Sequence, residues 1–143
     1  MAIRVHGEDS EIDHYKAPLY AVIEWICKKL KLKVRSIDLI FISDIELKAM
    51  HKKYLSDDSY SDVMTFNLSD NHLIEAEIYI SLERARMQAA QFTVSLINEI
   101  CRLCIHACLH LAGFDDHCPE DQILMKREED AYVKQVEDRF LIH

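Results

Sequence analysis

The spacing of apolar residues in the first half of the chain predicts alternating strands and helices. Ala2–His6 is a short strand candidate, and Asp13–Leu32 carries apolar residues three or four positions apart, the period of an amphipathic helix. Ser36–Ser43 is rich in β-branched and aromatic residues, which favour a strand. Asp44 is expected to be the N-cap of a helix that runs to about Tyr54. This half therefore predicts the order strand, helix, strand, helix.

The second half predicts two strands followed by three helices, after a polar stretch at Leu55–Ser61 that we expect to be a loop. Turn-forming residues at Ser69–His72 indicate a hairpin between strands Val63–Leu68 and Ile74–Ile80. Helical patterns then cover Leu82–Phe92, Leu96–Ala112 and Glu120–Phe140. The simplest fold for this order is α+β, with a single mixed four-stranded sheet covered by about five helices. The length of 143 residues suits one domain over 1–143.

The stretch Leu96–Ala112 is apolar around most of its circumference, which predicts a helix in the centre of the domain. Cys101, Cys104 and Cys108 fall within about 60° of one another on this helix, so we interpret them as small core residues rather than ligands. The chain has five cysteines, and an odd number favours free thiols in a reducing compartment. With no apolar run of about 18 residues and no signal-peptide core, we expect a cytoplasmic protein without membrane contact.

Candidate chemistry gathers at the end of this central helix. His106 and His110 are four residues apart and share one helix face, and Gly113 and an Asp-Asp-His cluster follow at once. A chain reversal after Gly113 brings a third ligand back to the two imidazoles. This arrangement predicts one Zn²⁺ per chain in an open three-ligand site, with either Asp116 or His117 as the third ligand.

Neighbouring residues refine this prediction. A zinc protease helix carries its glutamate base directly after the first histidine, and Ala107 stands there, which argues against a peptidase. Glu99 lies two turns upstream of His106 on the same side, where it either orients a histidine or faces solvent. Asp115 and Glu99 are both candidate general bases.

The net charge of −8 argues against a broad nucleic-acid surface, so a metal and a local basic patch would have to hold any single strand.

Three blocks of the sequence resemble the YbeY family of bacterial single-strand endoribonucleases. The first holds His106, His110 and Leu111-Ala112-Gly113-Phe114, and the others are Tyr60–Phe66 and Ala76–Ser81. The resemblance extends over nearly the whole chain. It implies cleavage of single-stranded RNA, with roles in 16S ribosomal RNA 3′-end maturation and ribosome quality control. Ribosomal proteins or an assembly GTPase are the partners it implies.

The resemblance also bears on individual residues. The family's third ligand comes six residues after the second histidine, a position held here by Asp116, whereas the intrinsic preference of zinc favours His117. A family arginine that helps to hold phosphate is replaced by Leu55, and Lys52 or Lys53 could supply the missing charge. Arg102, one turn before His106, is the residue we expect to neutralise the scissile phosphate during catalysis.

Two other functions are compatible with the sequence. The acidic composition and the missing arginine favour a non-catalytic ribosome assembly factor in which the metal is structural, closed by both Asp116 and His117 or by Cys118. A metal-dependent hydrolase of small substrates would instead need a deep pocket with specific polar contacts. An open metal position beside a cavity would favour an enzyme.

Overall fold

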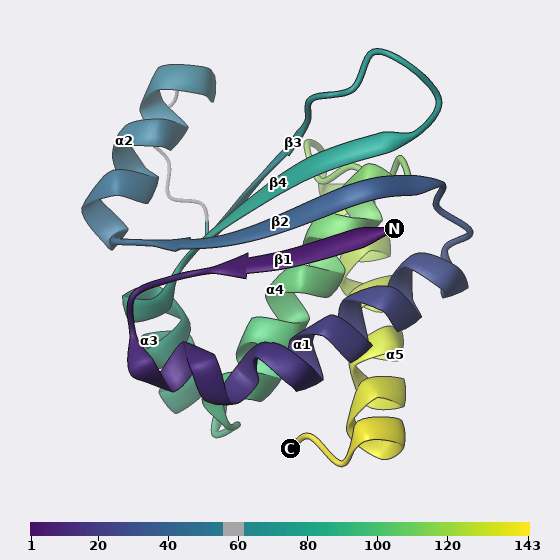
Figure 1. The fold of residues 1–143 in the computed structure, drawn as a ribbon. Coiled ribbons are helices and arrows are strands. Elements are labelled where there is room, and N and C mark those ends of the chain that lie inside the picture. Colours follow the sequence, from purple (N-terminus) through teal and green to yellow (C-terminus); the bar gives the residue numbers. More distant parts are fainter. Residues whose placement is uncertain (56–61) are drawn as a thin grey trace.

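In the computed structural model, which describes residues 1–55 and 62–143, the strands and helices follow one another in the predicted order (Figure 1). Their bounds are β1 Ala2–His6, α1 Ser10–Lys29, β2 Val34–Ile42, α2 Asp44–Leu55, β3 Val63–Asn67, β4 Ile74–Ser81, α3 Leu82–Phe92, α4 Leu96–Leu111 and α5 Pro119–Phe140.

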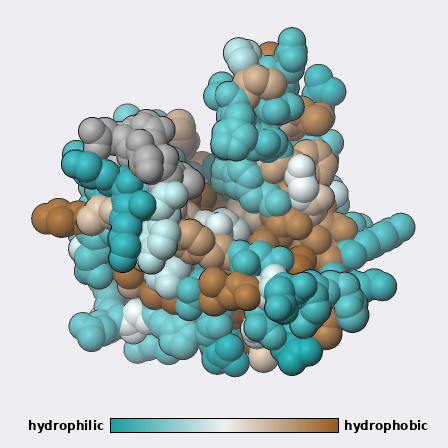
Figure 2. Space-filling view, turned by 90° about the horizontal axis from the view of Figure 1, so that it is seen from above, coloured by the Kyte–Doolittle hydropathy of each residue, from teal (hydrophilic) through white to brown (hydrophobic). Residues whose placement is uncertain are grey.

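The strands form one mixed sheet in the order β1-β2-β4-β3, which confirms the predicted α+β class. The pairs β1–β2 and β2–β4 are parallel, and β3 joins the edge antiparallel to β4 through the predicted hairpin. The helices α1, α3, α4 and α5 lie on one side of the sheet, and α2 lies at its end (Figure 1). Seen from above, the surface is largely hydrophilic, interrupted by patches of hydrophobic side chains (Figure 2).

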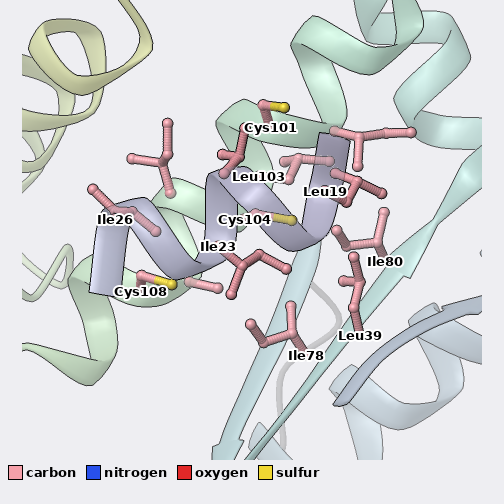
Figure 3. Packing of buried hydrophobic residues seen from close by; sticks show 14 of the residues in the cluster. Leu19, Ile23, Ile26, Leu39, Ile78, Ile80, Cys101, Leu103, Cys104 and Cys108 are labelled. Carbon is pink, nitrogen blue, oxygen red and sulfur yellow. The ribbon is translucent and has the colours of Figure 1, made fainter. Parts of the chain in front are cut away.

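The core lies between the sheet and the helices α1 and α4. Ile23 and Ile26 of α1 face Cys104 and Cys108 of α4, and β-strand side chains such as Ile78 close the layer from below (Figure 3). The predicted core role of the three helix cysteines is confirmed, because Cys101, Cys104 and Cys108 are all buried and unoxidised. Burial raises the pKa of Cys101 to about 12, so this thiol stays protonated at neutral pH.

The helix α4 is buried on every side but one. Eight apolar side chains between Ile100 and Leu109 are 5% exposed or less. Apart from the buried Asn98, the polar residues of the helix form one stripe, because they are spaced three or four positions apart: Glu99, Arg102, His106 and His110. The prediction of a buried central helix that carries both histidines on one face is therefore confirmed.

Two helix boundaries differ from the sequence prediction for identifiable reasons. Ser43, not Asp44, caps α2: its Oγ accepts a hydrogen bond from the Glu46 N–H at 3.1 Å, and its backbone N–H donates to the Glu46 carboxylate at 3.5 Å. This reciprocal pair is a capping box, whose Ser-x-x-Glu spacing was present in the sequence. In α1 the cap is Asp9, whose side chain accepts from the Glu11 N–H, and the helix ends before Lys31, which has a left-handed φ of 56°.

Two further observations concern segments singled out in the sequence. Of the predicted loop Leu55–Ser61, residue 55 ends α2 and positions 56–61 lie outside the described residues, as do Tyr60 and Ser61 of the second sequence block. Within the described ranges no single helix is long and apolar enough to cross a membrane, and α3 and α4 meet both criteria only when joined across a bend of 111°.

Candidate metal centre

Three potential donor atoms converge at the C-terminal end of α4. His106 Nε2 and His110 Nε2 are 3.1 Å apart, and Asp116 Oδ2 lies 3.5 Å from the first and 3.6 Å from the second. For metal–ligand distances of about 2.0–2.1 Å, the donors of a tetrahedral site stand about 3.3 Å apart. The donor triangle therefore fits a zinc-sized ion without rearrangement.

Hydrogen bonds orient both imidazoles for this purpose. His110 Nδ1 lies 3.0 Å from the carbonyl oxygen of Phe114, which can only accept, so Nδ1 carries the proton and the neutral ring presents its Nε2 lone pair. His106 Nδ1 lies 2.8 Å from Glu129 Oε2 and is fixed in the same way. Two lone pairs that face each other at this distance repel, and a cation between them removes the repulsion.

The turn after α4 brings the third donor to the imidazoles. Gly113 has a φ of +100°, a conformation that residues with a Cβ rarely adopt, and it ends the helix. The Phe114 N–H then bonds back to the Leu109 carbonyl at 3.0 Å, and the Gln122 side chain donates to the Asp116 carbonyl at 3.1 Å. The chain is thereby held with Asp116 folded over the helix end.

The two alternatives for the third ligand occupy different environments. The Asp116 side chain is 38% exposed and contacts both imidazoles, whereas the His117 side chain is 84% exposed and its Nε2 lies 3.1 Å from Asp115. The donor group that spans α4 comprises His106, His110 and Asp116, and His117 belongs only to an exposed group with Asp115 and Asp116. Cys118, considered as a fourth ligand of a closed site, is in neither group.

Glu129 of α5 is the most important residue that the sequence reasoning missed. It is 8% exposed, and burial alone would raise its pKa, but hydrogen bonds from His106 and Arg102 outweigh that effect and lower the pKa below its usual value. The role assigned to Glu99 as the orienting partner of a histidine therefore belongs to Glu129. A signal existed: Glu129 occupies the buried stripe of α5 with Met125, Val133 and Val136, where a carboxylate is out of place unless it is paired.

Arg102 lines the same region but is already paired. Its Nη1 lies 2.8 Å from both Glu129 Oε1 and Asp130 Oδ1. The guanidinium therefore balances the carboxylate that orients His106, and its direct contact with phosphate stays a prediction. Lys126, a second cation of the lining that sequence reasoning missed, pairs with Asp130 at 2.9 Å.

The two lysines proposed as phosphate-binding residues are elsewhere. Lys52 and Lys53 are exposed on the last turn of α2 and are not among the residues that line the cavity beside the donors. The Lys53 ammonium lies 5.3 Å from the Tyr54 ring centroid. The described structure thus does not bring either lysine to the metal donors.

A cavity of about 320 Å³ adjoins the donor triangle and extends along the polar stripe of α4. Glu99 lines it and is 1% exposed, so neither sequence expectation for this residue, histidine partner or solvent-facing, is correct. Burial raises the pKa of Glu99 to about 7, with a further contribution from the nearby carboxylate of Asp62. Its Oε1 has no hydrogen-bond partner among the described residues.

Comparison with known proteins agrees with this geometry. The family model of the endoribonuclease YbeY matches residues 2–137. The chain belongs to the YbeY family. Relatives named endoribonuclease YbeY include one from Chlorobaculum parvum, 36% identical over 73% of this chain and 74% of the relative, and one from Flavobacterium psychrophilum, 34% identical over 87% and 91%.

A solved structure is similar over nearly the entire YbeY-family chain. The solution structure of a protein from Thermotoga maritima superposes with a TM-score of 0.66 and 27% identity, covering 96% of this chain and 91% of the other. This similarity over nearly the full length of both chains supports the fold described above.

The Glu129 contact leads to a test of the metal centre in this YbeY-family protein. Replacing Glu129 with Gln keeps an acceptor for His106 but removes the negative charge, and such orienting partners typically contribute about 10- to 100-fold in metal affinity. We expect Glu129→Gln to weaken zinc binding by this factor in competition with a chromogenic chelator. Asp130→Asn is the matched control, because Asp130 also pairs with Arg102 but does not touch His106. Equal losses in both variants would contradict the assigned role.

Glu99 leads to a second test, on stability. The pKa of Glu99 is higher in the folded than in the unfolded protein, and below about pH 4.5 the carboxyl is protonated in both. As the pH rises to about 7, Glu99 ionises in the unfolded chain but stays largely protonated in the folded protein. The free energy of unfolding therefore falls over this range. Glu99→Gln removes this loss. In metal-stripped protein we expect urea unfolding to give a stability gain that grows from about pH 4.5 to about 7, to at most about 3 kcal/mol. The same change at exposed Glu8 should leave the pH profile unaltered, and a flat profile for Glu99→Gln would refute the assignment.

Proposed function

We propose that this protein is a zinc-dependent endoribonuclease that cleaves single-stranded RNA. The observation that carries the proposal is the convergence of two imidazole Nε2 atoms and one carboxylate oxygen within 4.8 Å of one another, beside a cavity. A donor set of this size leaves one tetrahedral position for solvent or substrate, as in catalytic rather than structural zinc sites. Membership of the YbeY endoribonuclease family supports RNA as the substrate.

His106, His110 and Asp116 are the residues that would hold one Zn²⁺ per chain. Imidazole and carboxylate donors in a tetrahedral arrangement suit zinc well. When bound, the ion would polarise a phosphate oxygen and lower the pKa of a coordinated water. One carboxylate in place of a third imidazole makes the net charge of the site less positive.

The surrounding residues orient the two imidazole donors. The Glu129 carboxylate accepts the Nδ1 proton of His106, and the Phe114 carbonyl accepts that of His110. Burial lowers the pKa of His110, so this imidazole stays unprotonated and available at neutral pH. Arg102 stabilises the Glu129 carboxylate, and rotation of its guanidinium toward a phosphate would add positive charge to the transition state.

The charges of the cavity make the ion necessary for substrate binding as well as for chemistry. Among the described lining residues, carboxyl groups outnumber cations: Arg102 and Lys126 are the cations, and the carboxyl groups are those of Asp62, Glu99, Asp116 and Glu129. A phosphate that approaches this wall without the ion would be repelled. The protein therefore recruits RNA through a bound cation rather than through a basic surface, which is consistent with the net charge of −8.

The cellular role we propose is that implied by the family resemblance. The substrate is 16S ribosomal RNA, in 3′-end maturation and in ribosome quality control, and the protein acts in the cytoplasm as a single domain over 1–143. Ribosomal proteins or an assembly GTPase would bring it to the ribosome. A non-catalytic assembly factor with a structural metal is less well supported, because no fourth protein donor joins the His106 group within the described residues.

The central experiment measures metal and cleavage in the same preparations. We expect about one zinc per chain by mass spectrometry and cleavage of a single-stranded but not a double-stranded RNA, with both zinc and cleavage lost in His106→Ala. Chelation should abolish RNA binding as well as cleavage, because the unloaded cavity is acidic. Product ends, 2′,3′-cyclic phosphate or 3′-hydroxyl, distinguish attack by the ribose from attack by water. Stoichiometric zinc without cleavage of any single strand would instead favour the assembly-factor alternative.

The third ligand is tested by a pair of neighbouring substitutions. Asp116→Ala removes a donor atom and should lower zinc affinity by at least about 100-fold, with loss of cleavage. His117→Ala changes an exposed side chain and should leave zinc affinity within about twofold of wild type. The reverse pattern, measured by the same chelator competition, would make His117 the ligand.

A further inference from the structure

The end of the cavity away from the metal donors is built from polar groups that the protein itself leaves unsatisfied. Glu99 lies there, in the first turn of α4, and Asp62 and Gln88 line the same cavity. None of these three side chains makes a hydrogen bond or ion pair within residues 1–55 and 62–143. The polar residues at the metal end, by contrast, are all paired. Polar groups that converge without partners on one cavity are typical of a ligand subsite.

Glu99 is the centre of this arrangement. It lies seven residues before His106 on the same face of α4, about 10 Å away along the helix axis. The residue is 1% exposed, and its Oε1 has no hydrogen-bond partner in the part of the chain that the structure describes. A buried carboxyl of this kind calls for N–H donors, which the described protein does not supply and a ligand would.

Phe92 supplies a flat apolar surface at the same end. It is the last residue of α3, it lines the cavity, and it is 61% exposed although phenylalanine usually gains from burial. Exposed aromatic rings beside a nucleic-acid site serve as stacking surfaces for unpaired bases, and such stacking tolerates any base. The polar groups nearby would then determine which base is preferred.

We propose that this end of the cavity is a subsite for one guanine base of a single strand, stacked on Phe92 and read by Glu99 and Gln88. Guanine presents two adjacent N–H donors, N1–H and N2–H, which match the two oxygens of a carboxylate, and its O6 accepts from the Gln88 amide. Uracil offers one N–H between two carbonyls, and adenine and cytosine direct a ring lone pair at the carboxylate. The proposal rests on the proposed function, since it assumes RNA as the substrate.

The size of the cavity and the charge of the subsite agree with one nucleotide whose base lies at the Glu99 end. The whole cavity, metal end included, has a volume of about 320 Å³, which is at the small end of ligand pockets and suits one nucleotide. The two carboxyls, Asp62 and Glu99, disfavour a phosphate at this end but attract the polarised N–H groups of a base. The strand would therefore place a phosphate at the metal donors and a base against Glu99.

The test compares strands that differ in a single exocyclic group. Labelled hexauridylates with 2′-O-methyl riboses carry one central guanine, hypoxanthine or uracil, and hypoxanthine differs from guanine only in lacking the N2 amine. Binding to the zinc-loaded full chain is measured by fluorescence anisotropy, with strand integrity checked on a gel. We expect the guanine strand to bind at least about tenfold more tightly than the other two.

Two variants assign this preference to the residues named. Glu99→Leu fills the same space without an acceptor and should bring the guanine-to-hypoxanthine ratio to about one, while Phe92→Leu should weaken all three strands by about tenfold or more. Glu24→Leu, the same change at an exposed position of α1, is the control. Equal binding of the three strands, or a ratio unchanged in Glu99→Leu, would overturn the guanine subsite and leave RNA binding intact. No binding of any strand would overturn both this proposal and the proposed function.

Discussion

The structure depends on one constraint: α4 must be enclosed by apolar contacts on most of its surface while one polar stripe stays open to a cavity. The apolar side of α4 packs against α1, α5 and the sheet at once, and this packing sets the position of the helix within narrow limits. The residues of the polar stripe are therefore held in fixed positions as well. Because the histidine backbones cannot shift, two hydrogen bonds are enough to orient both rings, and the donor atoms meet at distances that match a small cation.

The two ends of the cavity differ in how their charged groups are paired. Near His106 each charge is matched: Arg102 lies between Glu129 and Asp130, and the carboxylate lies between the arginine and the imidazole. Such a network is stable in a partly buried position because no member is left unpaired. At the other end Glu99 has no such partner, and its raised pKa is the physical sign of that difference. Catalytic sites commonly combine a rigid, satisfied half with a half that is completed by the ligand.

Much of this was accessible from the sequence because the decisive patterns are local. The element order followed from apolar periodicity, and the histidine pair followed from the i, i+4 spacing that precedes Gly113. The choice between Asp116 and His117 was not accessible in this way. It depends on how the turn after Gly113 directs consecutive side chains, and a one-residue difference reverses their directions. Glu129 was missed for another reason, since it comes from a helix 23 residues further along the chain and only the packing of α5 on α4 brings it to His106.

The contact between His106 and Glu129 has a consequence for how the protein assembles. The candidate donors all lie within positions 106–116, so one short stretch of the chain would supply every protein ligand of the ion. The orienting carboxylate, however, belongs to α5. Full affinity for an ion would therefore develop only when α5 has docked, and by thermodynamic linkage a bound ion would make undocking of α5 less favourable. Docking of α5 and metal occupancy of the α4 donors would therefore be coupled, so that each would stabilise the other.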